Sequence, residues 1–224
     1  MSPLSTTDIL IRQEAVFTEA ASLLATLSSP TRLKLIHFLS QAPHTVEHLS
    51  TKARESLANT SLHLKRMLGE GVVTVSRLGQ KREYTLHPAL NHFWEHSQDF
   101  TFTLRPALSL NHDKDKSVLA WQHGLKNTIA MLKERKAILL DIRPSDEQTT
   151  ASGLPDFILR QAINPLRSLT HKLPNNRPIL VLCRGRLCGQ SWLGTKQLRS
   201  KGFQAYRVEW SWQQLRPHIG KETT

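Results

Sequence analysis

The residues best suited to covalent chemistry are two cysteines that lie five positions apart, Cys183 and Cys188. The apolar run of residues 178–182 predicts a buried strand, and the residues from Gly189 onward predict a helix, so the cysteines bound a six-residue loop between them. Such a loop directs several main-chain amides at its centre, which lowers the pKa of a thiol and stabilises an anion on sulfur. Cys183 is therefore expected to be a nucleophile that takes sulfur from thiosulfate or a persulfide.

The other loop residues are expected to bind the sulfur-containing anion. They supply main-chain amides and two positive charges, and the set is Arg184, Gly185, Arg186, Leu187, Cys188 and Gly189. Cys188 has two interpretations: it attacks a persulfide on Cys183 and forms a disulfide or sulfur-bridged link, or it is a small apolar residue that starts the helix. Because the chain has only two cysteines, a disulfide framework and a four-cysteine zinc site are excluded.

A second group of residues is suited to reading DNA. Residues 45–53 and 56–70 predict two helices joined by a tight bend, as in a helix-turn-helix. One face of the second helix is predicted to pack inward, and it consists of Thr60, Leu64, Met67 and Leu68. The opposite face presents donors and acceptors for base edges and phosphates: Ser56, Asn59, Ser61 and His63. Leu57 and Leu62 lie nearby and either touch thymine methyl groups or are half-buried.

The charge of the chain also indicates an anionic partner, most commonly nucleic acid, because the net charge is +12. Most of the excess lies in residues 105–224, with twenty Lys and Arg against nine Asp and Glu, while residues 1–104 hold ten against nine. Within the first part, residues 52–82 hold seven against two. Three of these cations are predicted to form the basic tip of a hairpin that touches phosphate or the minor groove: Arg77, Lys81 and Arg82.

The first part of the chain is predicted to be a mainly helical domain over residues 1–104. Helical spacing predicts a helix over residues 8–27 capped by Asp8, and a second that begins at Ser29-Pro30 with Ser29 as its cap and ends at Ala42-Pro43. The β-prone runs 72–76 and 83–86 predict the hairpin, and residues 89–104 predict a last helix. Residues 105–117 are polar and weakly periodic, which predicts a linker.

The second part, residues 118–224, is predicted to be an α/β domain. Apolar runs predict strands over residues 137–142, 178–183 and 205–208, and helical spacing predicts helices over residues 118–135 and 189–201. Strands that alternate with helices in this way are typical of an open parallel sheet.

The first domain resembles the ArsR-type repressors. The segments that carry the resemblance are residues 27–33 (LSSPTRL), 45–49 (TVEHL), 56–64 (SLANTSLHL) and 71–73 (GVV), within a match that spans about residues 10–100. The resemblance implies a winged helix-turn-helix that binds double-stranded operator DNA as a homodimer, paired through helices at about residues 9–27 and 88–104. The family's usual turn glycine is replaced by Arg54-Glu55.

Many proteins of this family sense metals, but this sequence departs from both of their sites. The cysteine pair near the third helix is missing, because residues 45–53 contain no cysteine. In the last helix, His92 and His96 are spaced to face one ion, yet no acidic residue stands at the family's position. We therefore expect no metal site and no cofactor.

The second domain is similar to the rhodanese family over about residues 117–218. The loop that Cys183 begins is the main resemblance, supported by Asp141-Ile-Arg-Pro144 and by Gly202-Phe203 with Val208. The resemblance implies a catalytic cysteine that carries a persulfide, and a six-residue loop resembles the sulfur-transferring members. Two departures put efficient turnover in doubt: residues 152–157 replace the family's His-Ile-Pro-Gly-Ala stretch, and Gln148 replaces an aromatic residue.

These patterns predict a cytoplasmic DNA-binding transcription regulator, a repressor by its resemblance, in which sulfur accepted by Cys183 modulates DNA binding. The N-terminus has no signal-peptide pattern, and no apolar run is long enough to span a membrane. One alternative is a sulfurtransferase enzyme that uses a Cys183 persulfide, with the first domain serving for dimerisation or targeting. Another is a constitutive repressor whose second domain is unreactive.

Overall fold

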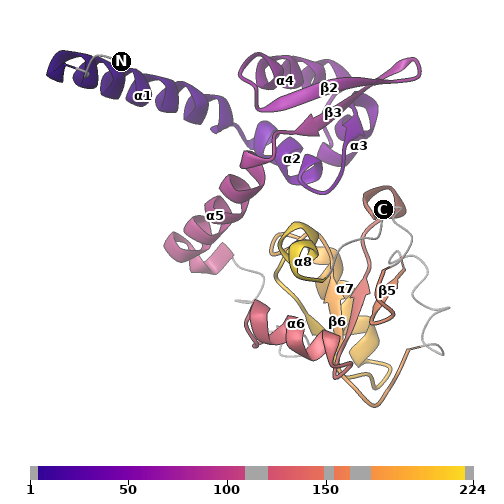
Figure 1. Cartoon of the computed structure of the whole chain (residues 1–224). Helices are drawn as coiled ribbons and strands as arrows, with labels where there is room; N and C mark the ends of the chain where they lie inside the picture. Colours follow the sequence, from indigo (N-terminus) through magenta and orange to yellow (C-terminus); the bar gives the residue numbers. More distant parts are fainter. Residues whose placement is uncertain (1–4, 109–120, 149–153, 162–172, 220–224) are drawn as a thin grey trace. The chain divides into compact units, whose positions relative to one another are not determined.

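The computed structural model describes residues 5–108, 121–148, 154–161 and 173–219 (Figure 1). The chain divides into two compact units, residues 1–94 and 95–224, and the described residues form one hydrophobic core in the first unit and two in the second. Residues 106–108 of the predicted linker form a short 3-10 turn, and residues 109–117 lie outside the described ranges. The predicted domain limits, 1–104 and 118–224, stay a prediction.

The first unit begins with two helices whose starts differ from the prediction. Helix α1 (Thr6–Leu27) is capped by Ser5: its hydroxyl accepts from the Asp8 amide at 3.2 Å, and the Asp8 carboxylate accepts from the Ser5 amide at 3.1 Å. Asp8 is thus the third helical residue of a capping box and not the cap. Helix α2 (Pro30–Leu39) has Pro30 at its start as predicted, but Ser29 makes no side-chain cap bond and the helix ends three residues early.

The next two helices form the predicted helix-turn-helix. Helix α3 (Val46–Ala53) is capped by Thr45, and α4 (Leu57–Gly69) is capped by Ser56. Between them Arg54 takes a left-handed conformation with φ of 56°, at the bend where the resemblance implied a glycine. The prediction that Thr60, Leu64 and Met67 pack inward from α4 is confirmed, because all three are buried. The same prediction is wrong for Leu68, which is 38% exposed.

A small antiparallel sheet completes the first unit, with strands in the order β1 (His44–Thr45), β3 (Lys81–Leu86), β2 (Val73–Leu78). Leu78 pairs with Lys81, so the predicted tip narrows to a two-residue turn in which Gly79 has φ of 62°. Helix α5 (Ala89–Leu104) has its predicted bounds, and its Trp94 is buried in the first core.

The second unit contains the predicted parallel sheet. Among the described residues its strands run in the order β5 (Ile158–Arg160), β4 (Ile138–Asp141), β6 (Ile179–Leu182), β7 (Ala205–Arg207). Alternate side chains enter two cores: Leu139 and Leu180 belong to one, with residues of helices α6 (Leu125–Lys133) and α8 (Trp212–Ile219). Leu140 and Val181 belong to the other, with Leu198 of helix α7 (Gly189–Arg199). Helices on both faces explain why β4 and β6 are buried throughout.

Three features of the second unit differ from the prediction. The helix expected over residues 118–135 begins only at Leu125, because residues 121–124 lead into it as an irregular segment, and residues 118–120 lie outside the described ranges. Strand β5 and helix α8 were not predicted, since β5 has only three residues and α8 contains Pro217.

None of the helices in the described ranges combines the length and apolar character that a membrane span requires.

Candidate nucleic-acid interface and thiol site

The N-terminal end of α4 is organised by a single carboxylate. Glu55 accepts hydrogen bonds from Lys34 Nζ at 3.0 Å, Asn59 Nδ2 at 3.0 Å and Thr31 Oγ1 at 3.1 Å. These bonds, that of Lys34 first, lower the pKa of Glu55. Glu55 thereby ties the start of α4 to α2 and holds the side-chain amide nitrogen of Asn59 toward its own carboxylate.

The four residues predicted to contact DNA therefore differ in availability. Ser56 is exposed, but its hydroxyl accepts from the Asn59 amide at 3.1 Å as the cap of α4. Asn59 and His63 are half-buried, and each has one polar atom engaged within the protein. Ser61 is exposed on the same helix. Ser56 caps α4 and the other three lie on it, and three of the four have a polar atom engaged within the protein.

Two further cations on α4 were not included in the predicted set. Lys65 and Arg66 are exposed, one turn beyond Ser61 and Leu62. Leu57 and Leu62 are 51% and 66% exposed, so neither is half-buried. The helical spacing of Lys65 from Ser61 could have identified the first of these cations from the sequence alone.

The hairpin, or wing, presents the predicted basic residues on exposed strand ends. Arg77 and Arg82 pair directly across the two strands, and Lys81 follows the turn. Directly opposed residues in an antiparallel pair project from the same face, so the two guanidinium groups repel each other without an anion between them. A phosphate group would relieve that repulsion.

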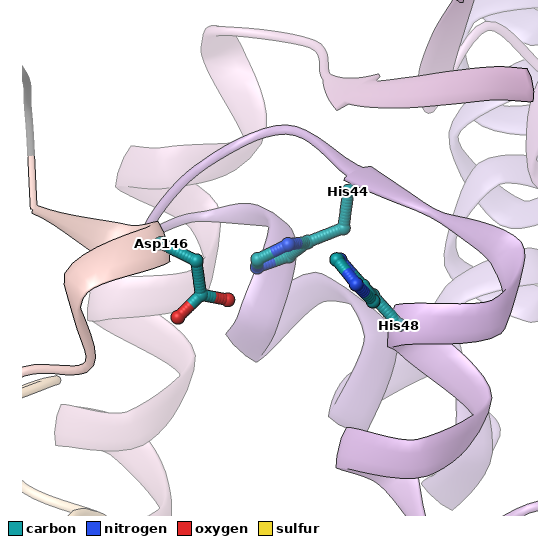
Figure 2. Close-up of side chains that lie close together, drawn as sticks. All are labelled: His44, His48 and Asp146. Atoms are coloured by element: carbon teal, nitrogen blue, oxygen red, sulfur yellow. The ribbon is translucent and has the colours of Figure 1, made fainter.

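Two histidines at the start of α3 were not singled out in the sequence analysis. His44 on β1 is buried and His48 on α3 is exposed, and their rings lie 6.3 Å apart in an edge-on arrangement (Figure 2). This contact joins β1 to α3, the first helix of the helix-turn-helix. Asp146, which Figure 2 also labels, belongs to the second unit. His92 and His96 are exposed on α5.

The thiol loop in the second unit has a tightly fitted backbone. Gly185 has φ of +90°, and a Cβ there would lie 3.4 Å from the Glu209 carbonyl oxygen. The Cys188 amide donates to the Gly185 carbonyl at 3.1 Å, and α7 begins at the next residue. Residues 183–188 are thus curled between β6 and α7, as the sequence predicted.

The arginines of the loop are engaged by carboxylates. Arg184 donates to both oxygens of Glu147, at 2.6 and 2.7 Å, and Glu147 is only 1% exposed. Burial disfavours the charge on Arg184, but the Glu147 carboxylate outweighs it and raises the pKa of Arg184. Arg186 donates to Glu209 at 3.2 Å. Leu187, which lies between Arg186 and Cys188 in the sequence, is 44% exposed.

A buried arginine on strand β7, which the sequence analysis did not single out, holds the main chain of this loop. Arg207 on β7 is 1% exposed and donates to Ser191 Oγ at 3.1 Å and to the Arg186 carbonyl. Its charge in the middle of the otherwise apolar run 205–208 was the available signal.

The segment Asp141–Pro144, which supports the rhodanese resemblance, forms a buried ion pair at the end of β4. Arg143 Nε and Nη2 donate to the two Asp141 oxygens at 3.0 and 2.8 Å, and both side chains are fully buried. Gln148 donates to the main-chain carbonyls of Asp141 and Arg143, at 3.2 and 2.8 Å. Gln148, which departs from the rhodanese pattern, therefore fixes this turn with polar contacts.

The two thiols are buried together, with Cys183 1% and Cys188 5% exposed. A hydrogen bond from the Cys183 thiol to the Cys188 sulfur, reinforced by burial, raises the pKa of Cys183 well above its ordinary value. The same bond lowers the pKa of Cys188 to about 6, against its burial, and Arg184 and the Gln190 amide act in the same direction. These directions favour Cys188 as the thiolate of the pair, whereas the sequence analysis expected the lowered pKa at Cys183; the role of Cys183 as the nucleophile stays a prediction.

Comparison with known proteins bears on the first unit. The family model "Bacterial regulatory protein, arsR family" matches residues 29–75. A comparison with curated proteins finds no match to the chain. Similar solved structures include a predicted DNA-binding transcriptional regulator from E. coli, 30% identical, which covers 41% of this chain and 98% of its own with a TM-score of 0.38.

Two other similar structures are those of a possible ArsR-family transcriptional regulator and of a transcriptional repressor. The homodimeric winged helix-turn-helix domain of Mb0332 from Mycobacterium bovis is 22% identical and covers 45% of this chain and 90% of its own, with a TM-score of 0.39. The transcriptional repressor BigR from Xylella fastidiosa is 25% identical and covers 45% and 96%, with a TM-score of 0.34.

Proposed function

We propose that the chain is a homodimeric transcription regulator, a repressor by type, that binds a palindromic duplex operator. The match of residues 29–75 to the bacterial regulatory protein model of the arsR family supports this proposal. The observation that carries the proposal is the exposed side of α4, where Ser56, Ser61 and Lys65 lie on a helix anchored by its inward face. The basic wing adds a second contact surface for the sugar–phosphate backbone.

The homodimer is supported by apolar surface on the helices that flank the winged helix-turn-helix. On α1, Val16 and Phe17 are 65% and 62% exposed, and on α5 Phe100 is 66% exposed. A second copy of the chain would cover these side chains and set two copies of α4 at the spacing of two half-sites. Phe17→Glu is expected to convert the dimer to a monomer in sedimentation velocity, whereas Leu193→Glu, at a half-exposed leucine of the second unit, leaves it dimeric.

The DNA proposal is tested by selection from a random-sequence duplex pool with the full chain. The native protein is expected to enrich a palindromic site, and Ser61→Glu to abolish binding to it, because a carboxylate on α4 would face the phosphates. Ser200→Glu adds the same charge at an exposed position of the second unit and serves as the control. Failure of the native protein to enrich any site overturns the proposal.

We further propose that the second unit, over about residues 118–224, is a rhodanese-like domain whose thiol pair accepts sulfur and thereby modulates DNA binding. The observation that favours it is the hydrogen-bonded Cys183–Cys188 pair, set between β6 and α7 with the charge of Arg184 beside it. The residues proposed to surround the incoming sulfur are Arg184, Gly185, Arg186, Leu187, Cys188 and Gly189.

The chemistry follows from which sulfur ionises first. The Cys188 thiolate attacks the outer sulfur of a persulfide, R–S–SH, forming Cys188–S–SH and releasing R–S⁻. Cys183 then attacks the Cys188 sulfur, expels HS⁻ and closes a Cys183–Cys188 disulfide, and its proton passes to the released sulfide. The dithiol loses two electrons and the donor sulfur gains them. This order reverses the one expected from the sequence, in which Cys183 accepts sulfur first.

Mass spectrometry after exposure to glutathione persulfide separates the two orders. The native protein is expected to lose two hydrogen atoms, and Cys183→Ala to retain one extra sulfur on Cys188. An equally fast gain of sulfur on Cys183 in Cys188→Ala supports the sequence-based order instead, and a native protein that never changes mass overturns sulfur acceptance. The operator affinity of the native protein, with and without the persulfide, tests the regulatory step: equal affinities contradict it.

The alternative function is a sulfurtransferase. It is favoured by the same thiol pair and disfavoured by the departures of residues 152–157 and Gln148 from the rhodanese pattern. Thiocyanate release from thiosulfate and cyanide at an enzymic rate, lost in Cys183→Ala, would establish a sulfurtransferase that uses a Cys183 persulfide. Failure of either cysteine to react with any thiol reagent would favour a constitutive repressor.

A further inference from the structure

One buried arginine connects the long helix α1 to the proposed DNA-contacting helix. Arg32 on α2 is 7% exposed, and its guanidinium donates to the carbonyls of Ala25, at 3.2 Å, and Thr26, both in the last turn of α1. Its remaining nitrogen, Nη1, lies 3.2 Å from Nδ1 of His63 on α4. One side chain thus contacts two helices that are far apart in the sequence.

This contact determines which ring nitrogen of His63 carries the proton. A guanidinium has five N–H donors, accepts no hydrogen bond and stays charged in proteins. Nδ1 of His63 must therefore be the acceptor, with its lone pair facing Arg32. A neutral imidazole carries one proton, so it is on Nε2.

The surroundings of His63 keep the ring neutral near pH 7. Burial and the positive charge of Arg32 lower the pKa of His63, and Arg66 acts in the same direction. Glu55 raises the pKa of His63, with an effect smaller than that of burial or Arg32 but larger than that of Arg66. Protonation at Nδ1 would place an N–H against the N–H of Arg32, so the neutral form is also the one that geometry favours.

We propose that Arg32 is a positioning residue that holds His63 as a neutral Nε2–H donor to an acceptor atom of the operator. His63 is one turn beyond Asn59 on α4, and its Nδ1 is occupied by Arg32, which leaves Nε2 for the ligand. The acceptor is a guanine ring nitrogen or a phosphate oxygen, both of which take one N–H. This inference rests on the proposed function of DNA binding.

The proton position is read first, without DNA. In the ¹⁵N-labelled full chain, long-range ¹H–¹⁵N correlations are expected to show Nδ1 of His63 unprotonated and Nε2 protonated at pH 7. Arg32→Lys keeps the charge but replaces the planar fork with a point donor, so it is expected to give a mixture of both tautomers. A native Nδ1–H signal, or an unchanged tautomer in Arg32→Lys, overturns the positioning role.

The donor role is read with a duplex selected by the native protein. In His63→Gln the side-chain amide places an N–H near the position of Nε2, whereas the shorter amide of His63→Asn reaches only the position of Nδ1. His63→Gln is expected to bind within about threefold of native, and His63→Asn about tenfold more weakly, as for one lost hydrogen bond. Equal affinities of the two variants overturn the donor role.

The two sources of the acceptor are distinguished by modified duplexes. Replacing a guanine by 7-deazaguanine, or a phosphate by a methylphosphonate, removes one candidate acceptor at a time, and the change that abolishes the difference between the Gln and Asn variants identifies the partner. If the native protein selects no duplex, the proposed function and the donor role fail together. The tautomer measurement then still decides whether Arg32 positions His63.

Discussion

Helix α4 and the thiol loop place their reactive groups in opposite surroundings. On α4 the groups that would meet DNA are exposed or half-buried, and buried residues hold the helix from its inner face. In the loop both sulfurs are buried, and the arginines around them are paired with Glu147 and Glu209. A surface that binds a polyanion can leave its charges solvated, whereas a buried thiol needs partners that decide which sulfur ionises.

The largest expected effect comes from breaking the ion pair between Arg184 of the thiol loop and the buried Glu147. Glu147→Gln removes the buried carboxylate that accepts from Arg184 and should reduce the free energy of unfolding by about 3 kcal/mol, as for other buried pairs that lose one partner. Glu134→Gln, in the exposed pair with Lys136, should cost less than about 0.5 kcal/mol. Guanidinium denaturation followed by tryptophan fluorescence measures both. Equal costs would mean that the loop is not held by its ion pair.

The ionisation of the thiols is the next prediction. Because the pKa of Cys188 is about 6, its thiolate absorbance should disappear as the pH falls through that value, while Cys183 stays protonated through neutral pH. Removing the hydrogen-bond donor in Cys183→Ala should raise the pKa of Cys188 towards that of an ordinary thiol. Ultraviolet absorbance titration of native protein and variant tests this, and identical midpoints would contradict the shared hydrogen bond.

A smaller effect is expected at the wing. The double variant Arg77→Gln/Arg82→Gln should weaken operator binding about tenfold. If each arginine neutralises one phosphate, the plot of log association constant against log salt concentration should become less steep by about two. Lys133→Gln/Lys201→Gln removes two exposed cations of the second unit and should leave the slope unchanged. A native slope in the wing variant would exclude the hairpin from the DNA contact.

The smallest effect separates a helix cap from a DNA contact. Ser56→Ala removes the hydroxyl that accepts from the Asn59 amide and should destabilise the protein by about 1 kcal/mol. Ser61→Ala, on the exposed surface of the same helix, should change stability by less than about 0.5 kcal/mol and act mainly on DNA affinity. Thermal unfolding and operator titration of both variants make the comparison. The opposite pattern would reverse the roles of the two serines.

Local pattern was sufficient for most of the architecture. Helical spacing and capping residues predicted α3, α4 and α5, and the apolar runs predicted β4, β6 and β7, because those signals depend on neighbours a few positions away. The same signals failed where an element is short or carries a breaker, as in β5 and α8. They also misplaced Leu68, since which half-apolar position of an amphipathic helix is covered depends on what packs against it.

The sequence by itself determined that a helix-turn-helix and a strand–loop–helix with two cysteines exist, because each is written in consecutive residues. Only the tertiary structure decided the chemistry within them. Arg32 meets His63 across 31 positions, and Arg184 meets Glu147 across 37, and no local pattern encodes either contact. Proton positions and thiol pKa values follow from such contacts, since they depend on the charge and burial that distant segments bring to one atom.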